Sequence, residues 1–168
     1  MIELRELGHG DAGAVECIYS PASVRFLGRG PMDAHEAREY VASAVASAEG
    51  RPRLGYTLGL VVDGDLLGVV KLRLNGPVAA VSYVLRANAW GRGYATEGVR
   101  RILTLGIDRL GAAAIRARHH PDNPASGRVL RRAGFVPTGV EAGFVTYALP
   151  EGRGQTRTAG PLVLRGVR

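Results

Sequence analysis

The stretch VAAVSYVLRANAWGRGYATEGVRRILTLGIDRL, residues 78–110, joins a strand pattern to a helix pattern through a glycine turn. Residues 78–85 run without a turn residue and are mostly apolar, which predicts a largely buried strand. After Gly93 the apolar spacing becomes that of a helix, and Gly111 predicts its end. The apolar face of this helix carries Ala95, Val99, Ile102, Leu103, Gly106 and Leu110.

The turn Gly91-Arg92-Gly93 has features of a phosphate site. A helix start leaves several main-chain N–H groups without partners, and the helix dipole adds partial positive charge there. Arg92 adds a full charge, and the two glycines let a ligand approach the main chain. A glycine pair is a weak signal by itself, so an ordinary strand-to-helix connection remains an equal alternative at this point.

Length and composition favour one domain spanning residues 1–168. No apolar run approaches the roughly 20 residues that a membrane helix needs, and the first residues do not resemble a signal peptide. We therefore expect a cytoplasmic protein without a membrane partner. Cys17 is the single cysteine, which excludes an internal disulfide, and we expect it to pack as a small apolar residue.

The net charge of +7 comes from basic residues spread along the whole chain. Of the 22 basic residues, Lys71 alone is lysine and the others are arginine. The spread argues against a dedicated nucleic-acid-binding arm, which would gather its charge on one segment. It is equally compatible with a small anionic ligand.

Before residue 78 the sequence predicts a strand, two helices and two further strands. Asp11 is a cap residue type before the first helix, and Asp33 with Glu36 forms a capping-box pattern before the second. The turn at residues 63–65 predicts a hairpin. The expected elements are strand 2–7, the helix between Asp11 and Ser20, loop 24–32, the helix between Asp33 and Gly50, and strands 54–62 and 66–74.

After the long helix, residues 114–119 predict a strand that a crossover would place parallel to strand 78–85. Asn123 followed by Pro124 predicts the start of a short helix that ends at Gly134. The order β-α-α-β-β-β-α-β-α-β-β is that of a mixed α/β sheet covered by helices. The last two strands are predicted at residues 135–149 and 158–167, with a loop at 150–156 between them.

Three passages of the sequence point to a known family: Trp90-Gly91-Arg92-Gly93-Tyr94-Ala95-Thr96-Glu97; Asn123-Pro124-Ala125-Ser126 followed by Ala133-Gly134-Phe135; and Leu4-Arg5-Glu6-Leu7 followed by Asp11-Ala12. Through them, residues 2–149 resemble the GCN5-related N-acetyltransferase (GNAT) superfamily, and most of all its ribosomal-protein N-terminal acetyltransferase (RimJ/RimL-like) group. The resemblance implies an α/β fold and the co-substrate acetyl-CoA.

By this resemblance, the main chain after Gly91 holds the pyrophosphate of the co-substrate, and the edge of strand 78–85 pairs with its pantetheine arm as an added strand would. Asn123 is expected to contact the same arm, and Ser126 to lie near the thioester sulfur. The expected cofactor-binding residues are Val84, Leu85, Arg92, Gly93, Tyr94, Ala95, Thr96, Asn123 and Ser126.

The implied reaction is direct transfer of an acetyl group to a primary amine. The Leu85 N–H is the expected donor to the oxyanion, and Ser126 is the expected general acid. Many members of the superfamily have a tyrosine acid where this chain has Leu130. Related enzymes often carry a glutamate base where this chain has Ala80, so the general base is not identified. A water chain near Ser82 or Tyr83, and Glu141, remain alternatives.

Two adjacent histidines, His119 and His120, follow the predicted strand 114–119, but no third ligand accompanies them at suitable spacing. We therefore predict no metal site. Arg131 and Arg132 could attract the 3′-phosphate of the co-substrate or simply be solvated. Trp90 is expected to be a packing residue beside the glycine turn.

The leading prediction is an acetyl-CoA-dependent N-acetyltransferase whose acceptor is a protein N-terminus or a small molecule such as an antibiotic or a metabolite. A non-catalytic CoA-binding sensor of the same fold is the main alternative. A dinucleotide fingerprint lacks its third glycine, and a nucleic-acid-binding module lacks clustered charge. The acceptor, the acyl group and a homodimer are left open, with the acceptor pocket expected from residues 20–32 and 141–160.

Overall fold

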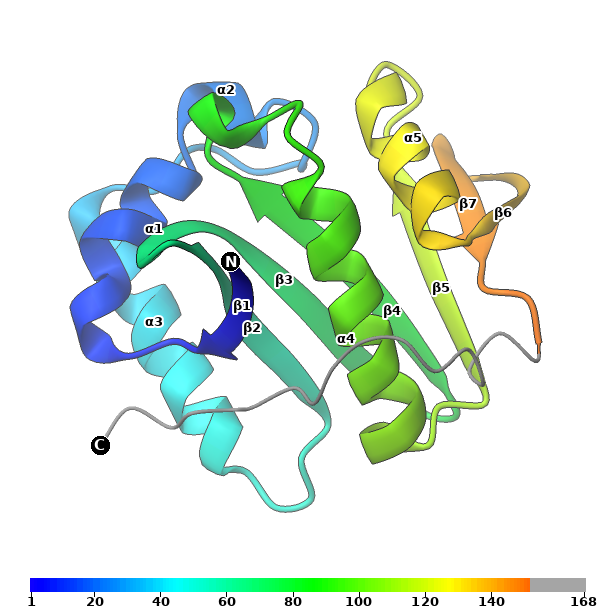
Figure 1. Cartoon of the computed structure of the whole chain (residues 1–168), viewed down its shortest axis with the longest axis horizontal. Helices are drawn as coiled ribbons and strands as arrows, with labels where there is room; N and C mark the ends of the chain where they lie inside the picture. The colour runs from blue at the N-terminus through cyan, green and yellow to red at the C-terminus, as the bar shows by residue number, and fades with distance from the viewer. Residues whose placement is uncertain (152–168) are drawn as a thin grey trace.

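The computed structural model describes residues 1–151, which form one mixed sheet of seven strands with helices on both faces (Figure 1). The strands are β1 Ile2–Glu6, β2 Gly55–Val62, β3 Asp65–Asn75, β4 Val78–Leu85, β5 Ala114–His119, β6 Val136–Glu141 and β7 Phe144–Ala148. Their order is β1-β2-β3-β4-β5-β7-β6, and only the β4–β5 pair is parallel. The antiparallel strands β1–β4 are therefore joined to the antiparallel group β5, β7 and β6 by one parallel pair, which the crossover between β4 and β5 makes possible.

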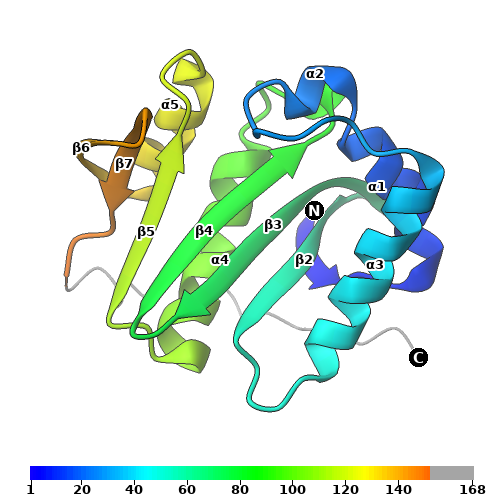
Figure 2. The same ribbon diagram turned by 180° about the vertical axis from the view of Figure 1, so that it is seen from behind.

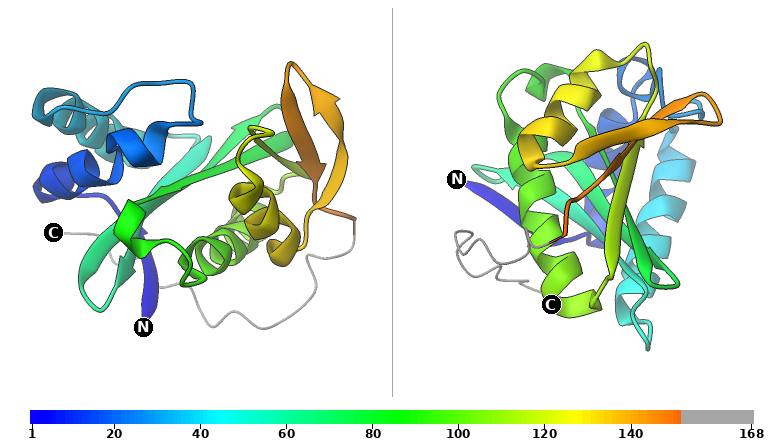
Figure 3. Two further views of the ribbon diagram at one scale, coloured as in Figure 1. Left: turned by 90° about the horizontal axis from the view of Figure 1, so that it is seen from above. Right: turned by 90° about the vertical axis from the view of Figure 1, so that its right-hand side faces the viewer.

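The helices are α1 Ala12–Ile18, α2 Pro21–Val24, α3 Ala34–Glu49, α4 Tyr94–Leu110 and α5 Pro124–Ala133, with single 3₁₀ turns η1 His9–Asp11 and η2 Ala87–Ala89. α4 and α5 cover one face of the sheet, and α1 and α3 cover the other (Figures 1 and 2). The edge-on view in Figure 3 shows the sheet between these two helix layers. α2 lies near the end of β4.

Each helix layer has its own apolar core. On one face, the inner side of α4 packs Val99 and Ile102 against the strands, and both side chains are fully buried. On the other face, Ala37 and Val41 of α3 do the same. The helical spacing of these apolar positions explains why the two segments fold as helices on a sheet.

α4 lies close to the sheet because two of its inward positions are glycines. A Cβ on Gly98 would lie 2.5 Å from Leu60 Cδ1, and a Cβ on Gly106 would lie 2.7 Å from Leu72 Cδ2. Both distances are shorter than carbon atoms tolerate in a close-packed interior. The absence of a side chain at these two positions therefore lets α4 lie directly on β2 and β3.

β4 and β5 pair only where they begin. Val78–Ala80 lie opposite residues 114–116, whereas β4 continues to Leu85 and β5 to His119. Figure 2 shows the two strands diverging toward their carboxyl ends. Beyond Ala80, the edge of β4 on the β5 side therefore faces a gap, while its other edge stays paired with β3.

The structure confirms the mixed α/β class, the first five strands, the 63–65 hairpin and the helices α1, α3, α4 and α5 within a residue or two of the expected bounds. The prediction of one long strand over residues 135–149 is wrong. Ala142 and Gly143, with φ of 48° and 80°, turn this segment into the β6–β7 hairpin. The strand predicted at 158–167 lies outside the described residues.

Three smaller predictions in the N-terminal part are also corrected. Asp11 does not cap α1, because its carboxylate accepts two hydrogen bonds from Arg5, at 2.7 and 2.8 Å, and one from the Gly8 amide. Cys17 is exposed rather than packed. The short helix α2 was not expected, although Ser20 and Pro21 supply the cap and first-position signals that begin it.

Candidate active site

The glycine turn places free main-chain N–H groups at the start of α4. Gly91 and Gly93 have φ of 77° and 81°, a conformation that other residues rarely adopt. A Cβ on either would meet no protein atom within 4 Å, so the side of the turn that they face is open. The first helical bond runs from Glu97 N–H to Gly93 O at 3.1 Å, and within the described residues no N–H from 91 to 96 donates to another group.

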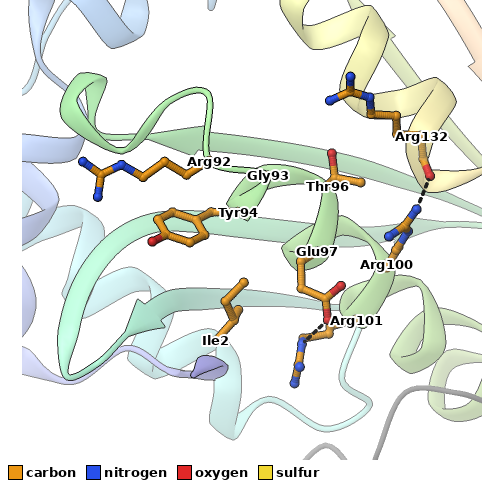
Figure 4. Close-up of a pocket in the computed structure, with 9 residues that line it drawn as sticks. All are labelled: Ile2, Arg92, Gly93, Tyr94, Thr96, Glu97, Arg100, Arg101 and Arg132. Carbon is orange, nitrogen blue, oxygen red and sulfur yellow. Dashed lines mark hydrogen bonds and ion pairs between the residues drawn. The ribbon is translucent and has the colours of Figure 1, made fainter.

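A cavity of about 480 Å³ opens at this helix start and is strongly basic (Figure 4). The Glu97 carboxylate is already paired with Arg101, at 2.8 Å, so it does not cancel the other positive charges. Arg92 points away from Arg132, which places guanidinium groups on both sides of the turn. Such a cavity suits an anion with several phosphates. Its charged side chains are Arg92, Glu97, Arg100, Arg101 and Arg132.

The two arginines predicted together at the end of α5 lie apart in the structure. Arg132 lines the cavity, and its carbonyl accepts a hydrogen bond from Arg100 at 2.7 Å, which ties α5 to α4. The guanidinium of Arg131 instead lies 5.9 Å from the centre of the Tyr147 ring. Arg132 is therefore the member of the pair that lies at the basic cavity.

The main-chain groups of β4 alternate between β3 and the gap. Arg86 N–H, one residue beyond the strand, donates to Leu67 O at 2.8 Å. Hydrogen-bonded pairs recur at every second residue of an antiparallel ladder, so the N–H and C=O of Val84 also face β3. Of the two residues predicted to contact a pantetheine arm, Leu85 thus has its main-chain groups on the gap side. The residues with main-chain groups on that side beyond Ala80 are Val81, Tyr83 and Leu85.

The Leu85 carbonyl is fully engaged, which leaves the Leu85 N–H as the gap-facing group at the end of β4. Ser23 Oγ donates to this carbonyl at 2.9 Å, and the Trp90 indole N–H donates to it at 3.1 Å. Trp90 is half exposed, with 53% of its surface accessible, so it is less a packing residue than a hydrogen-bond donor. It holds the end of β4 beside the glycine turn.

Ser126 lies next to a tyrosine hydroxyl across the gap. Its Oγ is 2.7 Å from the Tyr83 hydroxyl of β4, which also donates to Ser126 O at 3.0 Å. Burial raises the pKa of Tyr83 to about 12, against the opposing effect of the Ser126 hydrogen bond. The phenol is therefore protonated at neutral pH. The sequence named Tyr83 only beside a possible water chain for the amine proton, and nothing in the sequence indicated its contact with Ser126.

Asn123 caps α5, because its side-chain oxygen accepts the Ser126 N–H at 3.3 Å. This structural role is sufficient to explain the residue, and its predicted contact with a co-substrate stays a prediction. The bond also fixes the first turn of α5, and with it the position of Ser126.

The buried His119 connects β5 to β7. Its Nδ1 is 2.7 Å from His120 O and its Nε2 is 3.1 Å from the Tyr147 hydroxyl. Gly127 lets α5 pack on this pair, since a Cβ there would lie 2.7 Å from His119 Nε2. Within residues 1–151, no cluster of three or more His, Cys, Asp or Glu side chains could hold a metal ion.

A second cleft, of about 660 Å³, occupies the gap between β4 and β5 and contains the Tyr83–Ser126 pair. Ala80 offers no base there, as expected from the sequence. Among residues 1–151, Glu141 of β6 is the one carboxylate that lines this cleft. The structure thus has a basic cavity at the start of α4, an open edge of β4 beyond Ala80, and a cleft that contains the Tyr83–Ser126 hydroxyl pair.

A mixed sheet that parts between β4 and β5, with a glycine turn opening α4 beside a basic cavity, defines an acetyltransferase-like fold. The family described as "Acetyltransferase (GNAT) domain" matches residues 2–136, and the chain belongs to this family. None of the helices in the described part of the chain is long and apolar enough to cross a membrane.

Among similar proteins, the "Uncharacterized N-acetyltransferase p20" of Bacillus licheniformis is 32% identical over 62 residues. This match spans 37% of the chain and 35% of that protein, about a third of its length. Similar folds include aminoglycoside acetyltransferase AAC(6')-Ib in complex with paromomycin and acetyl-CoA, with a TM-score of 0.75, 17% identity, and 94% of this chain and 98% of that chain covered. Mycobacterium smegmatis RimJ in complex with CoA-disulfide has a TM-score of 0.73, 20% identity, and coverage of 88% and 80%.

Proposed function

We propose that the chain is an acetyl-CoA-dependent N-acetyltransferase that acetylates a primary amine directly. The observation that carries this proposal is the row of main-chain N–H groups at residues 91–96, which have no partner among the described residues and border an arginine-lined cavity. A diphosphate is the ligand chemistry that such a helix start and such charges bind best. A neutral cofactor would leave both unused.

The rest of the site fits the remainder of coenzyme A. The gap-facing groups of Tyr83 and Leu85 offer an extended amide chain the hydrogen bonds of an added strand. This edge leads from the glycine turn to the cleft that holds Tyr83 and Ser126. The pantetheine arm is such an amide chain, so its thiol end would reach the proton donors when its diphosphate lies at the turn.

In the reaction, the neutral acceptor amine forms a C–N bond with the acetyl carbon, the C–S bond breaks, and the amine loses one proton while the sulfur gains one. The Leu85 N–H is the group that would stabilise the carbonyl oxygen as charge develops there. The Leu85 carbonyl, an acceptor, takes no part in this stabilisation; the hydrogen bonds that it accepts from Ser23 and Trp90 hold the end of β4 in place.

The Tyr83–Ser126 pair supplies the proton for the leaving sulfur. The Tyr83 phenol carries one hydrogen; when that hydrogen turns from Ser126 O to Ser126 Oγ, the hydrogen of Ser126 is free to point into the cleft. This phenol, whose pKa is about 12, keeps its proton at neutral pH and polarises the serine. The proton of the amine goes to solvent or to Glu141, the carboxylate in the cleft.

Within the GNAT family, we propose membership of the ribosomal-protein N-terminal acetyltransferase group, on the basis of the Trp90–Glu97 turn sequence. The acceptor class that follows is a protein N-terminal α-amine or a small-molecule amine, in the cytoplasm. The fold does not separate these acceptors, because AAC(6')-Ib with paromomycin and the ribosomal acetyltransferase RimJ are almost equally similar to the chain.

The experiment that tests this function measures two quantities on the full chain: CoA affinity by calorimetry, and thiol release from acetyl-CoA with a panel of amines. Saturable CoA binding together with amine-dependent thiol release supports the proposal. Absence of CoA binding at millimolar concentration contradicts it. CoA binding without turnover on any amine would favour the non-catalytic sensor, for which the alanine at position 80 is the specific argument.

A further inference from the structure

One wall of the cleft between β4 and β5 carries two arginines without acidic partners. Arg116 and Arg118, both exposed, project from β5 and line the cleft. Within residues 1–151, neither makes an ion pair or a side-chain hydrogen bond. Residues 152–168 contain no aspartate or glutamate that could pair with them. The two positive charges are therefore available to a ligand in the cleft.

Strand geometry holds both guanidinium groups on the same side of the sheet. Residues two apart on a strand point to the same face and are roughly 7 Å apart. Arg116 lies beside Ala148 and Arg118 beside Thr146 on the neighbouring β7. The guanidinium of Arg118 is also placed by Phe144, whose ring centre lies 4.4 Å from its central carbon. A guanidinium that is already stacked on a ring loses less conformational entropy when it binds a carboxylate.

Aromatic rings frame the mouth of the same cleft. His120 stacks on Phe26, with ring centres 5.4 Å apart, and meets the edge of Phe144 at 6.0 Å. Arg25 adds a further guanidinium 5.1 Å from the Phe26 ring. Against these positive charges, the cleft offers the single carboxylate of Glu141. A ligand with several ammonium groups would meet net repulsion here.

We propose that the preferred acceptor is an α-amine in a molecule that also carries a carboxylate a short distance from that amine, with Arg116 and Arg118 as the residues that recognise the acidic group. This inference rests on the proposed acetyltransferase function and names its acceptor class. Such a carboxylate occurs in a small acidic amine and in a protein N-terminus whose second or third residue is acidic. Polycationic amines are disfavoured acceptors.

The test compares three peptides that share an N-terminal alanine and an amidated C-terminus and differ only by Glu, Gln or Lys at the second and third positions. Thiol release from acetyl-CoA gives kcat/KM for each. We expect the Glu peptide to exceed the Gln peptide by about tenfold and the Lys peptide by more, a margin that two partly exposed charge pairs can supply. The margin should shrink as ionic strength rises from about 0.05 to 0.5 M. Tripeptide and octapeptide versions separate the two sources: equal rates indicate a small amine, and a faster octapeptide indicates a protein N-terminus.

Variants assign the preference to the two arginines. The double substitution Arg116→Glu with Arg118→Glu should reverse the order of the Glu and Lys peptides, while CoA affinity stays unchanged. The matched control is Arg109→Gln, an exposed arginine in the last turn of α4, which should leave the order intact. Equal kcat/KM values for the three peptides would overturn the acidic-acceptor inference alone. The proposed function itself would fail only if no peptide were acetylated and CoA did not bind.

Discussion

The Tyr83 hydroxyl lies 2.7 Å from Ser126 Oγ and so joins β4 to α5 across the gap where β4 and β5 have parted. Both residues line the cleft between these strands, so a proton donor faces the space that a substrate can occupy.

Removing the Tyr83 hydroxyl should slow the chemical step. For Tyr83→Phe we expect kcat to fall by about 10- to 100-fold, because a general acid typically contributes at least this much and Ser126 remains as a partial donor. KM for acetyl-CoA should change less than about twofold, since the phenol does not contact the diphosphate turn. Steady-state thiol release measures both values. Tyr56→Phe, on β2, is the matched control; its hydroxyl makes no recorded hydrogen bond within residues 1–151, and normal kcat is expected.

We expect kcat/KM to rise with pH and not to fall again at moderately alkaline pH. Burial raises the pKa of Tyr83 to about 12, so its proton-donating form persists up to that pH and is lost only above it. The amine acceptor becomes more reactive as it deprotonates, and kcat/KM should therefore climb between about pH 6 and pH 10 and then level. A falling limb near pH 8 or 9 that disappears in Tyr83→Phe would contradict this assignment.

The Trp90 indole should act through the Leu85 peptide. Trp90→Phe keeps an aromatic ring but removes the N–H that donates to Leu85 O at 3.1 Å. Ser23 still holds the same carbonyl, so we expect a loss in kcat of roughly threefold to tenfold, equivalent to one weak hydrogen bond. Combining it with Ser23→Ala should lower kcat further than the product of the two single effects. Unchanged turnover in the double variant would remove the positioning role.

Asp11 should contribute to stability instead of capping a helix. Asp11→Asn removes the charge that accepts two hydrogen bonds from Arg5, and we expect unfolding to become easier by roughly 1–3 kcal/mol. Burial works to raise the pKa of Asp11, but the Arg5 and Gly8 hydrogen bonds outweigh it and lower the pKa. A lowered folded pKa means that this stability is present above the unfolded value and is lost as pH falls through the folded one. Urea unfolding at pH 7 and at about pH 3 should therefore show a smaller difference between wild type and variant at the lower pH.

The elements of this chain and its sheet class could be predicted from its sequence, whereas side-chain contacts between distant residues could not. The glycine turn, the α3 capping box and the Asn123 cap each depend on residues within a few positions of one another, and the structure has all three. The Tyr83–Ser126 contact joins residues 43 positions apart, and it depends on how two strands diverge. The Arg5–Asp11 pair shows the same limit at short range. Asp11 is a residue type that often caps helices, but here its carboxylate binds Arg5 instead.

The segment after α5 shows why strand patterns alone mislead. Residues 135–149 contain the turn residue types Pro137, Gly139 and Gly143, and of these only Gly143 lies in the hairpin turn, while the other two lie within β6. The residues expected to contact acetyl-CoA, the homodimer and the cytoplasmic location stay predictions. For Leu85, Arg92 and Gly93 the structure supports the predicted contact with acetyl-CoA. The N–H of Leu85 faces the gap beside β4, and the N–H groups of Arg92 and Gly93 have no partner among the described residues.

The most direct test of the account is the CoA affinity of Gly93→Asp measured by calorimetry beside Gly76→Asp. Both glycines have positive φ, and a Cβ on either meets no protein atom within 4 Å, so the two variants carry a similar backbone penalty. Only Gly93→Asp puts a carboxylate at the start of α4, against the diphosphate. The account predicts that CoA affinity falls at least about 100-fold for Gly93→Asp and stays near normal for Gly76→Asp. Equal CoA affinity in the two folded variants would contradict the account.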